Sequence, residues 1–169
     1  MRLPSLFILP LLLAGAKAAT LDIHYAPAEN LEAIDVDLIN QAGLTIDMAA
    51  YVLSDPAVIE ALSDAADRGV AVRLYLDAGE YPAQAQALAG LFARAGVDAR
   101  LKAGGALMHM KAYAVDRERL RTGSGNFSRS GLSRQDNDLV VIDDARAVER
   151  FERDFEAIFA SGRRRDLAR

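Results

Sequence analysis

The sequence predicts an α/β protein with a mixed, largely parallel sheet flanked by helices. Short apolar runs alternate with longer stretches of helical periodicity between residues 20 and 102. Pro56, Gly69 and Gly96 stand where helices should begin or end. The 169 residues, 51% of them hydrophobic and 26% charged, suit one globular domain with its own core.

The first half of the domain is predicted to repeat a strand-helix unit. Apolar runs predict strands over 21–25, 44–52, 70–76 and 97–102. Apolar residues recurring every three or four positions predict helices over 29–41, 56–68 and 82–95. Right-handed crossovers would place these helices on the faces of the sheet.

The pattern changes after residue 102. Strands are predicted over 110–115 and 120–123, joined by the polar turn 116–119, and a last strand over 139–142. Asp143 or Asp144 should cap a final helix that buries Val148, Phe151, Phe155, Ile158 and Phe159. No glycine- or serine-rich linker interrupts the sequence, so residues 19–169 are expected to form one domain.

Residues 1–18 are expected to be a cleaved signal peptide. Arg2 precedes an apolar stretch over 3–16, and Ala16-Lys17-Ala18 fits a small-residue cleavage site. The stretch is shorter than the roughly 20 apolar residues of a membrane span. The protein should then be secreted or periplasmic, with an uncleaved anchor or a buried N-terminal segment as the alternative.

Charge and composition limit the classes of site. Cysteine is absent, which excludes disulfides, thiol nucleophiles and thiolate metal sites. Two histidines argue against a conventional metal cage, and no cofactor is expected. Residues 19–100 carry 13 acidic and 4 basic side chains, whereas residues 101–134 carry 7 basic and 2 acidic ones. This distribution suggests a local anionic ligand rather than a chain coated in nucleic acid, although the basic cluster taken alone is more typical of a solvated charged turn around Arg117 to Arg121.

The residues that carry chemistry lie between His109 and Asn126. From His109 to Asp116 the sequence reads H-x-K-x-x-x-x-D, and G-S-G-N ends at Asn126. On a strand, His109 and Lys111 would share one face about 7 Å apart, close enough to contact one phosphate. The lysine supplies charge, and the histidine can attack phosphorus or move a proton. Ser124 and Asn126 could donate to the remaining phosphate oxygens.

This segment resembles the HKD signature of the phospholipase D superfamily, including its trailing G-S-x-N. The resemblance extends to Tyr25-Ala26-Pro27 and to residues 46–51 and 66–73. In length and layout the chain is similar to small bacterial endonucleases with one HKD motif per chain, and to bacterial phospholipases D. The resemblance implies a phospholipase D-like α/β/α sandwich.

The resemblance also implies a mechanism and a partner. One histidine forms a phosphohistidine and a second protonates the leaving oxygen, without metal. The family needs two HKD motifs per active site, and His24 lies in no such motif. The resemblance therefore implies a homodimer with one shared site that binds a phosphodiester substrate. Asp116 is carried over among the catalytic residues as the motif's acid, a structural and electrostatic support more than a phosphate contact.

One segment departs from the family pattern. Relatives usually carry a glutamate shortly before the last strand, where it can orient the histidine. Here Asn137 takes that position; either Asp136 or Asp138 serves instead, or the site is weakened. A weakened site would suit a protein that only binds phosphate, the alternative to a phosphodiesterase.

The sequence leaves the substrate open between phospholipid and nucleic acid. The basic segment favours nucleic acid, and the acidic remainder disfavours it. The residues that could form an apolar entrance for a lipid, or equally part of the core, are Leu107, Met108, Met110 and Phe127.

Overall fold

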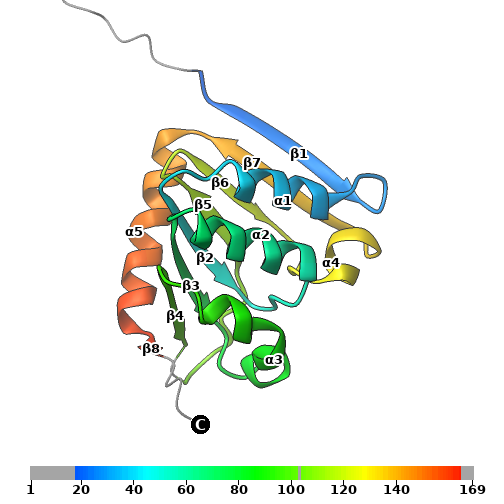
Figure 1. Cartoon of the computed structure of the whole chain (residues 1–169). Helices are drawn as coiled ribbons and strands as arrows, with labels where there is room; N and C mark the ends of the chain where they lie inside the picture. The colour runs from blue at the N-terminus through cyan, green and yellow to red at the C-terminus, as the bar shows by residue number, and fades with distance from the viewer. Residues whose placement is uncertain (1–17, 103, 165–169) are drawn as a thin grey trace, which may run out of the picture.

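The computed structural model describes residues 18–102 and 104–164 (Figure 1). Apart from Ala18, the predicted signal peptide lies outside the described residues. The described chain folds into an eight-stranded sheet with helices on both faces, which confirms the predicted α/β class. A search of the described helices finds none with the length and apolar character needed to cross a membrane.

The strands and helices follow the predicted order closely. The strands are β1 (Thr20–Ala26), β2 (Thr45–Ala50), β3 (Ala71–Leu76), β4 (Val97–Leu101), β5 (Lys111–Val115), β6 (Arg119–Gly123), β7 (Asn137–Asp143) and β8 (Arg163–Arg164). The helices are α1 (Leu31–Asn40), α2 (Pro56–Asp67), α3 (Tyr81–Phe92), α4 (Arg129–Ser133) and α5 (Ala145–Ser161). Only α4 and β8 were not predicted, because both are too short to show a periodic pattern.

The sheet is mixed, in the order β1-β7-β6-β5-β2-β3-β4-β8. Its parallel part is confined to β2, β3 and β4, which α2 and α3 connect. The remaining neighbours in the described sheet are antiparallel, so the expectation of a largely parallel sheet holds only for this part. The reason is that β5 and β6 form a hairpin, and β1 joins the edge beside β7 instead of β2.

Two hydrophobic layers hold the helices to the sheet. On one face, α1, α2 and α3 cover a core that includes Leu31, Leu62 and Leu88 (Figure 1). On the other face, α5 buries Phe155 and its apolar neighbours against Ala112 and Ala114 of β5. Burying side chains of this size stabilises the fold by roughly 1.5–3 kcal/mol each. The predicted inward face of the last helix is confirmed, with Ile158 only partly buried.

The sheet has two opposite ends, which differ in chemistry. We call one the Lys111 edge, where β2, β3 and β6 end and β5 and β7 begin. We call the other the Asp116 edge, where a tight turn joins β5 to β6. Asp116 and Arg117 in this turn have positive φ values of 54° and 58°, as the two central residues of a type I′ turn do, and the Glu118 N–H donates to the Val115 carbonyl at 2.9 Å. Because several strands end or begin at the Lys111 edge, residues far apart in sequence lie near one another there.

Candidate active site

His109 and Lys111 are in direct contact at the Lys111 edge. The Lys111 Nζ atom lies 3.0 Å from His109 Nδ1 and 3.2 Å from Nε2, and it donates to the His109 carbonyl at 2.8 Å. The two ring nitrogens of His109 are bonded to the same ring carbon, and the ammonium is almost equally far from both. It therefore lies beside the imidazole ring and does not point at the lone pair of one nitrogen. The imidazole is exposed, whereas Lys111 is 7% exposed.

Lys111 is a buried cation without an acid to neutralise it. Among the described residues no carboxylate pairs with its ammonium group, and the Tyr51 ring lies beneath it at 5.1 Å. Burial lowers the pKa of Lys111 because the charged form loses hydration. An ammonium in this position attracts an anion, and a phosphate beside it would also contact the exposed imidazole.

The segment before β5 sets the position of His109. His109 precedes the strand instead of lying on it, because β5 begins at Lys111. The Met108 N–H donates to Asp77 at 2.8 Å, and the Met110 carbonyl accepts from Tyr51 N–H at 2.9 Å. The backbone is thus held on both sides of His109. The side chains of His109 and Lys111 therefore come closer than the 7 Å expected on a regular strand.

Asp77 is a buried acid directly after β3 that holds the segment before β5 in place by accepting the Met108 N–H. Burial raises the pKa of Asp77, but the backbone N–H groups of Met108, Gly79 and Glu80 outweigh burial and hold it below the ordinary value. Asp77 therefore stays ionised and keeps accepting the Met108 N–H at neutral pH. The sequence analysis missed it, although an acid directly after a buried strand was a visible signal.

Tyr51 is a second residue that the sequence analysis missed. Its ring lies 4.5 Å from the His109 ring, centroid to centroid, with the planes tilted by 54°. Its hydroxyl donates to Glu80 at 3.1 Å, which fixes the ring at the end of β2. From the sequence Tyr51 is only part of a family-like strand, because no local pattern indicates that its ring faces His109 and Lys111.

Ser124 and Asn126 lie on a loop at the same edge. The Asp138 N–H donates to Ser124 Oγ at 3.0 Å, and this hydroxyl donates to Asn137 Oδ1 at 3.0 Å. The Asn126 Oδ1 atom is buried and has no hydrogen-bond partner among the described residues. Phe127 anchors the loop to the chain after β2 through its N–H, which donates to the Val52 carbonyl at 3.1 Å. The loop therefore spans from β6 across the start of β5, where Lys111 lies.

The residues considered as substitutes for the family glutamate do not contact His109 in the described structure. Asn137 holds the loop together by accepting from Ser124 and donating to the Gly131 carbonyl at 2.9 Å. Asp138 lies in β7 opposite Tyr25, and Asp136 is exposed in the turn before β7. The structure thus shows Asn137 as a support for Ser124.

Asp116 lies at the opposite end of β5 from the His-Lys pair. Five residues of strand separate Lys111 from Asp116, which corresponds to about 16 Å. The Asp116 carboxylate accepts the backbone N–H groups of Gly43, Leu44 and Thr45 at 2.8–2.9 Å. Burial raises its pKa, but these three donors outweigh burial and lower the pKa overall. The placement supports the structural part of the role carried over from the motif.

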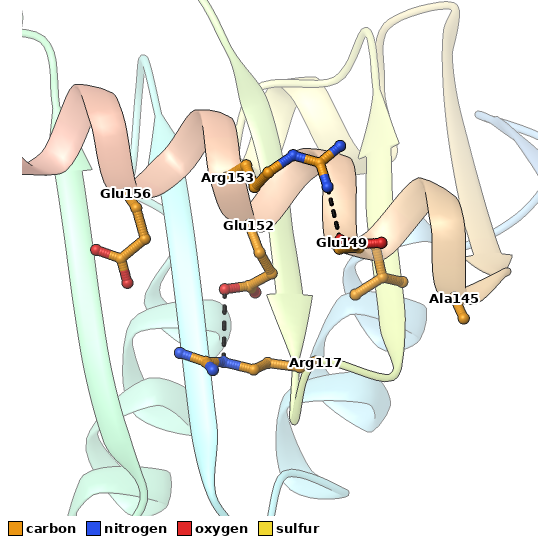
Figure 2. Close-up of a pocket in the computed structure, with 7 residues that line it drawn as sticks. Arg117, Ala145, Glu149, Glu152, Arg153 and Glu156 are labelled. Atoms are coloured by element: carbon orange, nitrogen blue, oxygen red, sulfur yellow. Dashed lines mark hydrogen bonds and ion pairs between the residues drawn. The ribbon is translucent and has the colours of Figure 1, made fainter.

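A separate groove of about 620 Å³ runs along α5, away from the motif. Figure 2 shows Glu152 facing Arg117, with Glu149 paired to Arg153 on the same helix. None of the predicted site residues lines this groove. No group of three or more His, Asp or Glu side chains in the described part of the chain is arranged to hold a metal.

Comparisons with known proteins point to one superfamily. The family model described as "Cardiolipin synthase, PLD-like domain" matches residues 36–159. The chain is 29% identical to a phospholipase D of Rickettsia bellii over 127 residues, which cover 75% of this chain and 63% of the relative. It is 29% identical to the human mitochondrial cardiolipin hydrolase over 118 residues, 70% of this chain and 46% of the relative. The chain thus spans between about half and two thirds of the length of these relatives.

The fold agrees with these sequence matches. The crystal structure of Nuc, a phospholipase D family member from Salmonella typhimurium, superposes with a TM-score of 0.80 at 25% identity. The superposition covers 88% of this chain and 99% of Nuc. The family model, the exposed imidazole and the buried ammonium at one edge of the sheet agree, and the chain therefore belongs to the phospholipase D superfamily of phosphodiesterases.

Proposed function

We propose that this protein hydrolyses phosphodiesters, with His109 as the nucleophile and Lys111 as the phosphate anchor. The observation that carries the proposal is the exposed imidazole of His109 in contact with a buried, unpaired ammonium. The lysine charge stabilises the negative phosphate oxygens as phosphorus becomes five-coordinate. Ser124 and Asn126 lie on the loop that crosses the start of β5, and we propose that they bind the remaining phosphate oxygens once substrate enters.

The proposed reaction has two displacement steps. A ring nitrogen of His109 attacks phosphorus, a nitrogen–phosphorus bond forms, and the bond to one alcohol oxygen breaks. That oxygen takes a proton from a second histidine and leaves as the alcohol. Water then gives a proton to the second histidine and attacks phosphorus, which releases the phosphomonoester and restores His109. No electrons are gained or lost, and Lys111 carries the positive charge that the phosphate requires.

We further propose that the second histidine is His109 of a second copy of the chain. In-line displacement needs the nucleophile and the acid on opposite sides of phosphorus, and Lys111 lies on the same side as His109. The other histidine, His24, lies on β1 and pairs with Glu29 at 2.7 Å. A two-fold axis near the Lys111 edge would bring two motifs together in one pocket.

Mixed dimers provide the test of the shared site. Chains carrying His109→Ala are mixed with wild-type chains, unfolded and refolded together, and assayed at constant total protein. A heterodimer has one copy of His109 and should be nearly inactive, so an equal mixture keeps roughly one quarter of the activity. Independent monomers would keep roughly half. A linear loss across the mixing series, or full activity from a chain that sediments as a monomer, contradicts the shared site.

We propose a phospholipid as the substrate in preference to nucleic acid. The basic segment of the sequence does not form one surface at the site, because Arg117 and Arg119 lie at the Asp116 edge and Arg121 is buried. These three cations are therefore not available to a polyanion bound at His109. Leu107 and Met110, on either side of His109, expose 62% and 38% of their surface, which suits an amphiphilic substrate. Met108 and Phe127 belong to the core.

The activity test uses three substrates and a chelator. Purified protein without residues 1–18 should hydrolyse a generic aryl phosphodiester and phosphatidylcholine vesicles faster than it nicks plasmid DNA. Excess EDTA should leave these rates unchanged, because the Lys111 ammonium and not a metal ion meets the phosphate charge. Loss of activity in EDTA with rescue by a divalent ion contradicts the proposed mechanism. Phosphate binding without turnover on any of the three substrates would indicate a binding protein instead.

A further inference from the structure

Arg121 is a buried cation that lies beneath the candidate active site without reaching its surface. It is 1% exposed, and its Nε and Nη2 atoms donate to the two oxygens of Asp35 at 2.7 and 2.8 Å. Asp35, on α1, is fully buried and also accepts the Tyr113 hydroxyl at 2.9 Å. Each charge of this pair is thus held by several hydrogen bonds inside the core.

The guanidinium also contacts the backbone of the phosphate anchor. Arg121 Nη1 donates to the Lys111 carbonyl at 3.0 Å. The regular pairing of β5 with β6 stops at Tyr113 and Arg121, so no strand residue opposite Lys111 is available for its carbonyl. Successive carbonyls of a strand point to opposite sides, and the neighbouring Met110 carbonyl bonds to Tyr51 beyond β2. The Arg121 side chain therefore replaces a missing ladder bond where the two strands separate.

The same guanidinium contacts the loop that carries Asn126. Its carbon lies 4.5 Å from the centre of the fully buried Phe127 ring. Phe127 in turn bonds through its N–H to Val52 and through its carbonyl to Ser54 and Asp55. Arg121 is thus packed between the strand that presents Lys111 and the loop that presents Asn126.

Stability alone does not account for this arrangement. Burying an arginine and an aspartate costs several kcal/mol each, and apolar replacements of similar volume often leave stability unchanged or improved. The planar guanidinium of an arginine has five N–H donors and can contact a carboxylate, a carbonyl and an aromatic ring at the same time, which an apolar side chain cannot do. We propose that Arg121 is a positioning residue that sets the geometry between Lys111 and Asn126; this inference rests on the proposed phosphodiesterase function.

The test replaces the whole buried network by apolar groups. In the triple variant Asp35→Leu, Tyr113→Phe, Arg121→Met, none of the three side chains keeps an unpaired polar group, and the Lys111 carbonyl loses the hydrogen bond from Arg121. We expect a folded protein whose kcat for an aryl phosphodiester falls by about tenfold to hundredfold, because sub-ångström displacements of a phosphate anchor are costly. The matched control is Asp47→Leu with Arg73→Met, which should keep kcat. This second bidentate pair lies on the α5 face with bonds of 2.6 Å and combines a buried aspartate with a partly exposed arginine.

A second measurement separates positioning from general loosening. If Arg121 acts through Lys111, then Lys111→Ala should cost much less in the triple variant than in the wild type. The proposal is overturned if Lys111→Ala lowers kcat by the same factor in the triple variant as in the wild type. It is also overturned if the folded triple variant has the kcat of the wild type. Should the triple variant fail to fold, Arg121→Lys keeps the charge facing Asp35 but loses the fork. That variant must then show the lower kcat, and full activity in it overturns the proposal.

Binding of inorganic phosphate distinguishes this proposal from the proposed function. Calorimetric titration with inorganic phosphate measures the affinity of the site around Lys111 without turnover. The triple variant should bind phosphate more weakly than the wild type. If the wild type shows no His109-dependent turnover, the proposed function fails while the phosphate titration still judges Arg121. Equal phosphate affinity in the wild type and the triple variant contradicts a positioning role.

Discussion

Replacing His109 by alanine should lower turnover of an aryl phosphodiester by about a thousandfold or more, because the proposed nucleophile and the proposed acid would disappear together in the proposed symmetric dimer. The imidazole is exposed, and its ring contacts Tyr51 at the edge of the sheet rather than in a core layer. The fold should therefore survive the substitution. Circular dichroism and the thermal midpoint check the fold, and initial rates check the activity.

His24, the other histidine of the chain, provides the matched control. His24→Ala removes an imidazole that pairs with Glu29 on β1, away from the motif, and should keep most of the activity. Alkaline quenching of the wild-type reaction should trap a phosphorylated protein that His109→Ala lacks, since phosphohistidine is labile in acid. A His109→Ala protein that keeps a tenth of wild-type activity, or an inactive His24→Ala protein, would show that the nucleophile is misassigned.

Glu152 should make the protein less stable as pH rises toward neutrality. Its side chain on α5 is buried, and neither carboxylate oxygen has a hydrogen-bond partner among the described residues. Burial and, next to it, the nearby Asp47 carboxylate together raise the pKa of Glu152 to about 7, against the opposing effect of Arg117 and Arg73. Arg117 approaches to 3.7 Å from the hairpin at the Asp116 edge (Figure 2).

The direction of this pH effect follows from the pKa of Glu152 in the unfolded chain and in the folded protein. In the unfolded chain Glu152 loses its proton near 4.5, whereas in the folded protein it keeps the proton to about 7. The folded state therefore binds more protons between these values, and its stability falls as pH rises through this range. The difference corresponds to about 3 kcal/mol at pH 8. Glu152→Gln should therefore stabilise the protein at pH 8 by up to that amount and have little effect at pH 4.5.

Urea unfolding at several pH values tests this expectation. The measured quantity is the difference in unfolding free energy between Glu152→Gln and the wild type, which removes the contributions of other titrating groups. Glu149→Gln is the control, because Glu149 lies one turn away in an exposed pair with Arg153 that should contribute about 0.5 kcal/mol or less. A Glu152→Gln effect that is constant from pH 4.5 to pH 8 would contradict the assignment.

The fold could be predicted in most parts because its signals are local. Pro56 and the Asp55 cap mark the start of α2, and the apolar stripe of α5 matches its buried face. Strand order depends on which distant segments pair, and no local pattern encodes that. The pairing of β1 with β7 and the limited parallel part of the sheet therefore became visible only in the structure.

The site was predicted where one short segment carries the chemistry. His109 and Lys111 lie two residues apart, so their proximity follows from any extended backbone. Tyr51, Asp77 and Arg121 reach the same place from β2, β3 and β6, and only the folded sheet brings them there. Arg121 in particular was counted as part of a basic segment, because a sequence does not distinguish a buried arginine from an exposed one.

The pairing of the first strand with the seventh has a consequence for the order of folding. Thr20 pairs with Asp143 and Ala26 with Asn137, which are 123 and 111 residues further along the chain. Contacts between such distant segments are slow to form, because a long loop must close before they contribute. As the chain is synthesised, β2, β3 and β4 can assemble with their helices long before β7 exists. We therefore expect β1 to be made first and hydrogen-bonded among the last, so that this late closure, more than helix formation, sets the folding rate.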